Sequence, residues 1–133
     1  MIRSLIVDDS TRFLEAARRL LEQDGMVVGV ATTIAEALEQ VGRLHPDVVL
    51  ADIDLAGESG FELVRRLHDD ARDARARVIL ISTHDYEDFV DLIEASPAVG
   101  FLSKSALSAG AIRDLLQHEE LDDEPLRGGG TDG

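Results

Sequence analysis

Short apolar runs alternate with segments of helical spacing along most of the chain. Five of these runs are continuous and rich in β-branched residues, as expected for strands that are buried on both faces of a sheet. They are SLIV (4–7), MVVGV (26–30), DVVLA (47–51), RVILI (77–81) and VGFLS (99–103). The pattern therefore predicts five short, buried strands.

After each run, apolar residues recur at intervals of three and four, which is the spacing of an amphipathic helix. The five groups are Phe13, Leu14, Ala17, Leu20 and Leu21; Ile34, Leu38 and Val41; Phe61, Val64 and Leu67; Tyr86, Phe89, Val90 and Ile93; and Ile112, Leu115 and Leu116. A strand followed by a helix, five times over, predicts an α/β fold of (βα)5 type. This is a doubly wound parallel sheet with right-handed crossovers and helices on both faces.

Residues at the expected helix ends agree with this interpretation. Thr33 and Glu36 have the spacing of a capping box, Gly25 follows the first helix, and Pro46 requires the second helix to end before the third strand. In open parallel sheets, ligands bind beyond the carboxyl ends of the strands, where the strand order reverses. We therefore expect a functional site just after the apolar runs.

Length and composition divide the 133 residues into one domain and a tail. Residues 1–118 are enough for a single buried core but not for two. Residues 119–133, EELDDEPLRGGGTDG, carry six acids, one Arg, one Pro and four Gly, with no apolar periodicity. This segment is expected to be an acidic, Gly-rich tail or interdomain linker.

The charge balance argues against several function classes. A net charge of −14 would repel phosphate backbones and anionic lipids, so we expect no direct nucleic-acid binding by this segment and no membrane association. No apolar run approaches the ~20 residues of a membrane span. The chain has no Cys, and strand-like sequence follows Met1 directly, leaving no room for a secretory signal. These features favour a cytoplasmic protein.

Polar residues whose side chains could bind a metal ion or take part in catalysis follow four of the five expected strands. They are Asp8 and Asp9 after the first, Asp52 and Asp54 after the third, Ser82 and Thr83 after the fourth, and Lys104 near the end of the fifth. Two carboxylates ~4 Å apart repel by ~4 kcal/mol near a protein surface, and one lysine cannot offset three of them. Oxygen ligands without Cys or clustered His predict a hard divalent cation, Mg²⁺. With that cation and Lys104 neutralising phosphoryl oxygens, and Ser82 donating a hydrogen bond, Asp52 is placed as a nucleophile toward phosphorus.

Each of these residues also has a purely structural explanation. The explanations are caps for the first helix (Asp8, Asp9, Ser10) or the fourth (Ser82, Thr83), a solvated lysine (Lys104) and a core aromatic (Phe101). Capping alone does not require three acids and one base at the same end of a sheet, so their convergence favours a site. His45, His68, His118 and Tyr86 stand in isolated surface or helix positions, where the structural explanation prevails.

Residues 1–118 resemble the receiver domain of bacterial two-component response regulators. The resemblance is carried by LIVDD (5–9), VVLAD (48–52), ILIST (79–83) and GFLSK (100–104), in the family's order and spacing. It implies a flavodoxin-like fold with strand order 2-1-3-4-5 and a phosphorylation-controlled signalling switch rather than a turnover enzyme. The sequences DDS and GFLSKS are most similar to the subgroup whose receivers precede a LuxR-type helix-turn-helix, which implies regulation of transcription.

The resemblance also implies a magnesium site. Asp52 would accept the phosphoryl group, and the carboxylates of Asp9 and Asp52 would bind Mg²⁺ directly. The backbone carbonyl of Asp54 would complete the direct protein ligands, and Asp8 would assist through water.

Further roles are implied by the resemblance around the phosphoryl group. Ser82 and Lys104 would contact the phosphoryl oxygens, and Phe101 would change rotamer on activation. Asp54 and His84 occupy positions that in this family modulate the lifetime of the acyl phosphate. We therefore expect these two residues to affect that lifetime, in a direction that the sequence does not give.

The same resemblance implies partners. A histidine kinase would donate the phosphoryl group, and a downstream output domain or a partner protein would respond. A homodimer would form through the last two helices or through the first and the fifth.

Two alternative functions stand beside the receiver. They are a small haloacid-dehalogenase-like, Mg²⁺-dependent phosphatase, which also uses Asp-x-Asp after a strand, and a receiver-like interaction module that is never phosphorylated.

Overall fold

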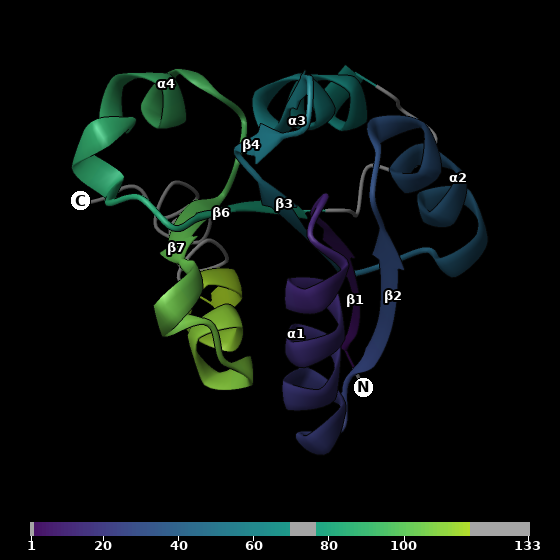
Figure 1. Cartoon of the computed structure of the whole chain (residues 1–133). Helices are drawn as coiled ribbons and strands as arrows, with labels where there is room; N and C mark the ends of the chain where they lie inside the picture. The colour runs from purple at the N-terminus through teal and green to yellow at the C-terminus, as the bar shows by residue number, and fades with distance from the viewer. Residues whose placement is uncertain (1, 70–76, 118–133) are drawn as a thin grey trace, which may run out of the picture.

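The computed structural model describes residues 2–69 and 77–117 and is built around one parallel sheet (Figure 1). Its strands are β1 (Arg3–Val7), β2 (Val27–Ala31), β3 (Val48–Asp52), β6 (Arg77–Ser82) and β7 (Gly100–Ser103). They lie in the order β2-β1-β3-β6-β7, with every neighbouring pair parallel. Counted along the chain, this is 2-1-3-4-5. The expected fold class and strand order are confirmed, and each strand end lies within one residue of the predicted run.

Helices cover both faces of this sheet. They are α1 (Thr11–Gln23), α2 (Ile34–Leu44), α3 (Gly60–Asp69), α4 (Val90–Ala95) and a helical segment at 109–117, with 3-10 turns η2 (Tyr86–Asp88) and η3 (Lys104–Ala106). α1 and the segment 109–117 pack on one face, and α2, α3 and α4 pack on the other (Figure 1). None of the helices in the described part of the chain is both long and apolar enough to cross a membrane.

The core consists of two apolar layers, one on each side of the sheet. Successive strand residues point to opposite faces, so Leu5 and Val7 join the layer beneath α2 and α3, whereas Ile6 joins the layer beneath α1. All three side chains are fully buried. A strand sandwiched in this way must be apolar at every position, which explains why the runs in the sequence are continuous.

The expected helix ends are present, with one difference at α2. The Thr33 hydroxyl accepts a hydrogen bond from Glu36 N (3.1 Å), but the Glu36 carboxylate accepts from Thr32 N (2.7 Å) rather than from the cap residue itself. This backbone hydrogen bond lowers the pKa of Glu36. Gly25, just beyond α1, has φ +91°, and α2 ends two residues before Pro46. These ends fix the directions in which the chain returns to the sheet.

The expected fourth helix, over Tyr86, Phe89, Val90 and Ile93, is wrong as one continuous helix. The segment forms the 3-10 turn η2, leaves helical geometry at Phe89 (φ −130°) and resumes as the six-residue α4, in which only Ile93 is buried. Acidic side chains at helical spacing, such as Glu87 and Asp91, repel each other in a continuous helix. Tyr86 is consequently 39% exposed instead of lying on a buried stripe.

A small hairpin between β3 and α3 was not expected from the sequence. β4 (Asp54–Leu55) and β5 (Glu58–Ser59) pair antiparallel around Gly57, whose φ is +76°. Glu58 Oε1 accepts a hydrogen bond from Ile34 N (3.0 Å), which joins the hairpin to the first turn of α2. Strands of two residues are too short to show periodicity, so the sequence pattern could not reveal them.

Candidate functional site

Three carboxylates gather at the carboxyl ends of β1 and β3. Asp8 and Asp9 follow β1, Asp52 ends β3, and one oxygen from each of the three lies within 4.8 Å of the others. Asp8 and Asp52 are buried, whereas Asp9 is exposed. The structure therefore brings together the three acids that the sequence placed at the ends of separate strands, and leaves one of them open to solvent.

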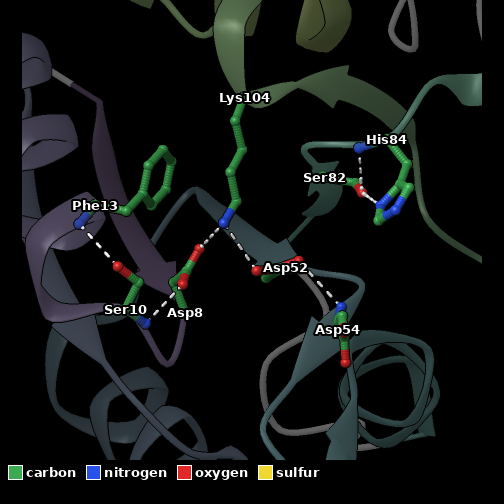
Figure 2. A network of polar contacts seen from close by, with 8 residues as sticks. All are labelled: Asp8, Ser10, Phe13, Asp52, Asp54, Ser82, His84 and Lys104. Atoms are coloured by element: carbon green, nitrogen blue, oxygen red, sulfur yellow. Dashed lines mark hydrogen bonds and ion pairs between the residues drawn. The ribbon is translucent and has the colours of Figure 1, made fainter.

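Lys104 supplies the positive charge of this cluster. It follows β7, and its Nζ lies 2.6 Å from Asp8 Oδ2 and 2.9 Å from Asp52 Oδ2 (Figure 2). Its side chain is only 15% exposed. Two buried carboxylates without a cation would carry a large desolvation cost, so Lys104 is a structural requirement as well as a potential reactive group.

Burial and charge shift the pKa values of the paired groups. Burial raises the pKa of Asp52, and the charge of Asp8 adds to this, while hydrogen bonds from Lys104 and from the backbone of Asp54 oppose it without cancelling it. For Lys104, burial opposes the charged form, but hydrogen bonds to Asp8 and Asp52 outweigh burial and raise the pKa. Lys104 is therefore firmly protonated at neutral pH, and Asp52 is an acid that would gain from a further cation nearby.

Backbone groups orient the two buried acids. Asp52 Oδ1 accepts a hydrogen bond from Asp54 N (3.0 Å), and Asp8 Oδ1 accepts one from Ser10 N (2.8 Å). Ser10 Oγ in turn accepts from Phe13 N (3.2 Å) and caps α1, as the structural explanation of Ser10 expected. Each carboxylate thus directs one oxygen to the backbone and the other to Lys104, while the Asp54 residue itself is exposed.

Gly60, the first residue of α3, lies directly against the backbone of Asp52. A Cβ at Gly60 would collide with the Asp52 carbonyl oxygen and would lie 2.9 Å from the carbonyl carbon. Gly60 N also donates a hydrogen bond to the Ile53 carbonyl (2.9 Å). The absence of a side chain at this position therefore lets α3 begin against the end of β3 and hold Asp52 in place.

Ser82 and His84 lie on the side of Asp52 away from Asp8 (Figure 2). Ser82 ends β6, one residue beyond the partner of Asp52 in the sheet, and is buried. Its Oγ accepts a hydrogen bond from His84 N (2.9 Å) and lies 3.5 Å from His84 Nδ1 (Figure 2). Neither Ser82 nor Thr83 caps α4, so that structural explanation is wrong. The hydroxyl is tied to its own turn rather than to Asp52.

Phe101 and Tyr86 form an aromatic contact beside this turn. Phe101 lies on β7, is half-buried, and meets the Tyr86 ring with centroids 5.9 Å apart at an interplanar angle of 61°. The Tyr86 hydroxyl donates to Glu94 Oε2 (3.0 Å), which raises the pKa of Tyr86. The aromatic side chain of β7 is thereby connected to η2 and to α4.

Three residues with a part in the site were missed by the sequence patterns. The Phe13 ring lies over Lys104, Glu58 joins the hairpin to α2, and Gly60 supports Asp52. Phe13 was expected only as part of the apolar face of the first helix, and Glu58 and Gly60 stand between the expected third strand and third helix, where the sequence shows no periodicity. The contacts of Phe13 and Glu58 join segments that are distant in sequence, and the Gly60 contact depends on how the hairpin folds back on β3, so no local signal reveals them.

The donor set fits a divalent cation. Three carboxylates face one ammonium, which leaves a net negative charge, and the groups that converge offer oxygen rather than sulfur or imidazole nitrogen. Magnesium prefers such ligands and needs only one or two carboxylates besides water. The exposed Asp9 places one carboxylate of the cluster in contact with solvent.

Comparison with known proteins agrees with this geometry. Residues 4–117 match the response regulator receiver domain model. Protein PilH of Pseudomonas aeruginosa is 37% identical over 65% of this chain and 72% of its own length. The transcriptional activator protein ExaE of Pseudomonas putida is 35% identical over 92% of this chain and 58% of its own length. The signal receiver domain of the putative response regulator NarL from Mycobacterium tuberculosis superposes with a TM-score of 0.74 at 30% identity, covering 90% of this chain and 96% of that one.

The chain belongs to the response regulator receiver domain family. It is therefore a receiver of two-component signal transduction, and its aspartate cluster fits the phosphorylation site of such a domain. The chain spans about half the length of several curated relatives that it matches. The activities of those longer proteins are accordingly not part of what the family membership establishes for this chain.

Proposed function

We propose that Asp52 accepts a phosphoryl group from the phosphohistidine of a histidine kinase or from a small acyl phosphate. The observation that carries the proposal is the Lys104 ammonium held between the buried carboxylates of Asp8 and Asp52, with the exposed Asp9 beside them. An Asp52 carboxylate oxygen attacks phosphorus, the bond from phosphorus to the donor nitrogen or oxygen breaks, and the donor leaves with that electron pair. The product is an acyl phosphate on Asp52, formed once per chain.

The proposal includes Mg²⁺ held by Asp9, Asp52 and the Asp54 carbonyl, with Asp8 assisting through water. When bound, the ion would neutralise charge on the phosphoryl oxygens. Lys104, whose Nζ lies 2.9 Å from Asp52 Oδ2, would provide a second positive charge beside the same carboxylate. The backbone hydrogen bond from Asp54 N keeps the Asp52 carboxylate oriented.

The proposed response begins at Ser82. Its hydroxyl would leave the His84 turn to donate to a phosphoryl oxygen, and Phe101 would then turn into the vacated space. Because Phe101 touches Tyr86, and Tyr86 is bonded to Glu94, the change would reach η2 and α4. Phosphorylation would thus favour an alternative arrangement of this face. His84 and the exposed Asp54 are proposed to modulate the acyl phosphate lifetime.

The output proposed for the whole protein is regulation of transcription. The name of the relative ExaE, and the likeness of GFLSKS to LuxR-type regulators, support it. Residues 119–133, outside the described residues, would then connect the receiver to an output domain. A homodimer through the last two helices or through the first and the fifth, and a cytoplasmic location, remain predictions from the sequence.

Intact-mass measurement after acetyl phosphate and MgCl₂ tests the phosphoacceptor. We expect the mass of one phosphoryl group to be added to the wild-type chain, none to Asp52→Asn, and the wild-type increment to Asp91→Asn, a matched change of an exposed acid on α4. Omission of MgCl₂ should abolish the increment. A chain that gains no mass at any magnesium concentration would favour the unphosphorylated interaction module. A second phosphoacceptor would show as the same increment on Asp52→Asn.

A further inference from the structure

The aromatic ring of Phe13 forms a wall of the site next to Lys104. Phe13 lies in the first turn of α1, and the Lys104 Nζ is 4.4 Å from the centre of its ring (Figure 2). This distance is within the range in which the negative face of an aromatic ring attracts an ammonium. The contact joins the start of α1 to the turn that follows β7.

Three groups surround the ammonium in this arrangement. A lysine ammonium carries three N–H donors and no acceptor. Oxygens of Asp8 and Asp52 lie at 2.6 and 2.9 Å, and the Phe13 ring occupies a third side. The ring therefore takes a place that a water molecule would fill beside a smaller aliphatic residue.

The position of the ring is itself held by the helix cap. Phe13 N donates to Ser10 Oγ, Ser10 N donates to Asp8 Oδ1, and the Phe13 side chain packs against the apolar layer beneath α1. The same short segment thus orients the Asp8 carboxylate and the ring. Both of these groups face Lys104.

We propose that Phe13 is a positioning residue that keeps the Lys104 ammonium beside Asp52 during phosphoryl transfer. The inference rests on the proposed function. A divalent cation among the acids would weaken the attraction of Asp8 for Lys104, because the carboxylate charge would then be shared. Because the four-carbon side chain of lysine is flexible and has many rotamers, the ammonium could then move away from Asp52. The ring is uncharged, does not compete for the metal, and continues to hold the ammonium.

Fluorination of the Phe13 ring tests the inference with little change of shape. Fluorine withdraws electron density from the ring face, so phenylalanine carrying one, two and then three fluorines, placed at position 13 alone, weakens the attraction stepwise. We expect the rate of phosphorylation by acetyl phosphate to fall with each fluorine, to about fivefold below wild type. Phe13→Leu should lose about as much, and Phe13→Tyr should stay within about twofold of wild type.

The matched control is the same fluorinated residue at Phe61, a half-buried ring on α3 that packs against the apolar layer on the opposite face of the sheet. Rates for that series should equal the wild-type rate, and urea unfolding should show all fluorinated chains to be as stable as the parent. A rate that is unchanged or faster across the Phe13 series, in a wild-type chain that is phosphorylated, overturns the inference.

A second measurement separates this inference from the proposed function. In the unphosphorylated protein, the ring current of Phe13 should shift the proton resonances of Lys104 Cε upfield, and the shift should persist at saturating MgCl₂. It should be absent in Phe13→Leu. If the wild-type chain keeps this shift but gains no phosphate, the proposed function fails while the hold on Lys104 stands. If MgCl₂ removes the shift, the positioning role fails even if phosphorylation proceeds.

Discussion

The carboxyl edge of the sheet has two halves that are built in different ways. The acidic half consists of Asp8, Asp9, Asp52 and Lys104, and the aromatic half consists of His84, Tyr86, Phe89 and Phe101. In the acidic half, two of the three carboxylates are buried and paired with one ammonium. In the aromatic half, the rings meet edge to face, the exposed Tyr86 hydroxyl donates to Glu94, and His84 N donates to Ser82 Oγ.

The helices beside the two halves also differ in how firmly they are held. α1 follows β1 in the acidic half, and α4 follows β6 beside the aromatic half. α1 has 13 residues, a Ser10 side-chain cap and three buried residues. α4 has six residues, no side-chain cap hydrogen bond and one buried residue, Ile93. Regions with little buried apolar surface and few internal bonds open at the lowest free energy. The acidic half therefore provides fixed geometry, whereas the aromatic half can rearrange at low cost.

Removal of the ammonium should break the acidic half most severely. Lys104→Met leaves Asp8 and Asp52 as buried, unpaired acids, and should lower the free energy of unfolding by about 3 kcal/mol. Urea denaturation without divalent ions measures the loss. The double variant Lys104→Met, Asp8→Asn removes one of the two charges and should recover part of it. A single variant as stable as the parent would show that the buried charges do not distinguish the halves.

Gly60→Ala should produce the next largest effect. The new Cβ would meet the Asp52 backbone, and the strain should cost about 2 kcal/mol of unfolding free energy. Gly42→Ala is the matched control, because a Cβ at Gly42, within α2, has nothing within 4 Å. That control should stabilise the chain by about 0.5–1 kcal/mol through helix propensity. Equal effects of the two alanines in thermal unfolding would contradict the close approach at Asp52.

Asp52→Asn should stabilise the acidic half at neutral pH. Because burial raises the pKa of Asp52 in the folded state, its ionised form opposes folding above that raised value, and the contribution is favourable only below the ordinary value of 3.8. Without divalent ions, the unfolding free energy at neutral pH should rise, and this gain should shrink as the pH falls toward the ordinary value. Urea denaturation of both chains at several acidic pH values measures this difference in unfolding free energy. A gain that grows as the pH falls would show that ionised Asp52 stabilises the folded state instead.

Tyr86→Phe should have the smallest effect, because the hydrogen bond to Glu94 lies at the surface. We expect a change of about 0.5 kcal/mol or less in unfolding free energy. Tyr86→Leu also removes the ring contact with Phe101 and should cost about 1 kcal/mol. If Tyr86→Phe were as damaging as Lys104→Met, the aromatic half would be as firmly held as the acidic half, and the contrast between them would disappear.

Much of the fold could be predicted because strands buried on both faces leave a continuous apolar run. VVLAD at 48–52 shows this clearly, since every residue of β3 is buried. The fourth helix was predicted poorly because the prediction rested on four apolar residues at helical spacing and did not consider the acidic residues between them. Helical periodicity describes one face of a segment and leaves out the acidic side chains on its other faces, whose repulsion disfavours a continuous helix. In the structure, the helical geometry is interrupted at Phe89.

The candidate site was predictable to the extent that its residues end strands. Asp8, Asp9, Asp52 and Lys104 could be placed at one edge because parallel strands bring their carboxyl ends together. Phe13 could not be assigned to the site, because an aromatic residue in the first turn of a helix is equally suited to the core. Its contact with Lys104 depends on how α1 packs beside the turn after β7.

Periodicity and motif spacing are local properties, so the amino-acid sequence was enough to identify the five strands, their polar ends and the family of the chain. The coordinates were needed to show that Lys104 bridges Asp8 and Asp52, that Asp9 stays exposed, and that Ser82 bonds to its own turn. Which polar atoms meet depends on the packing of distant segments, and desolvation then determines which charges must be paired.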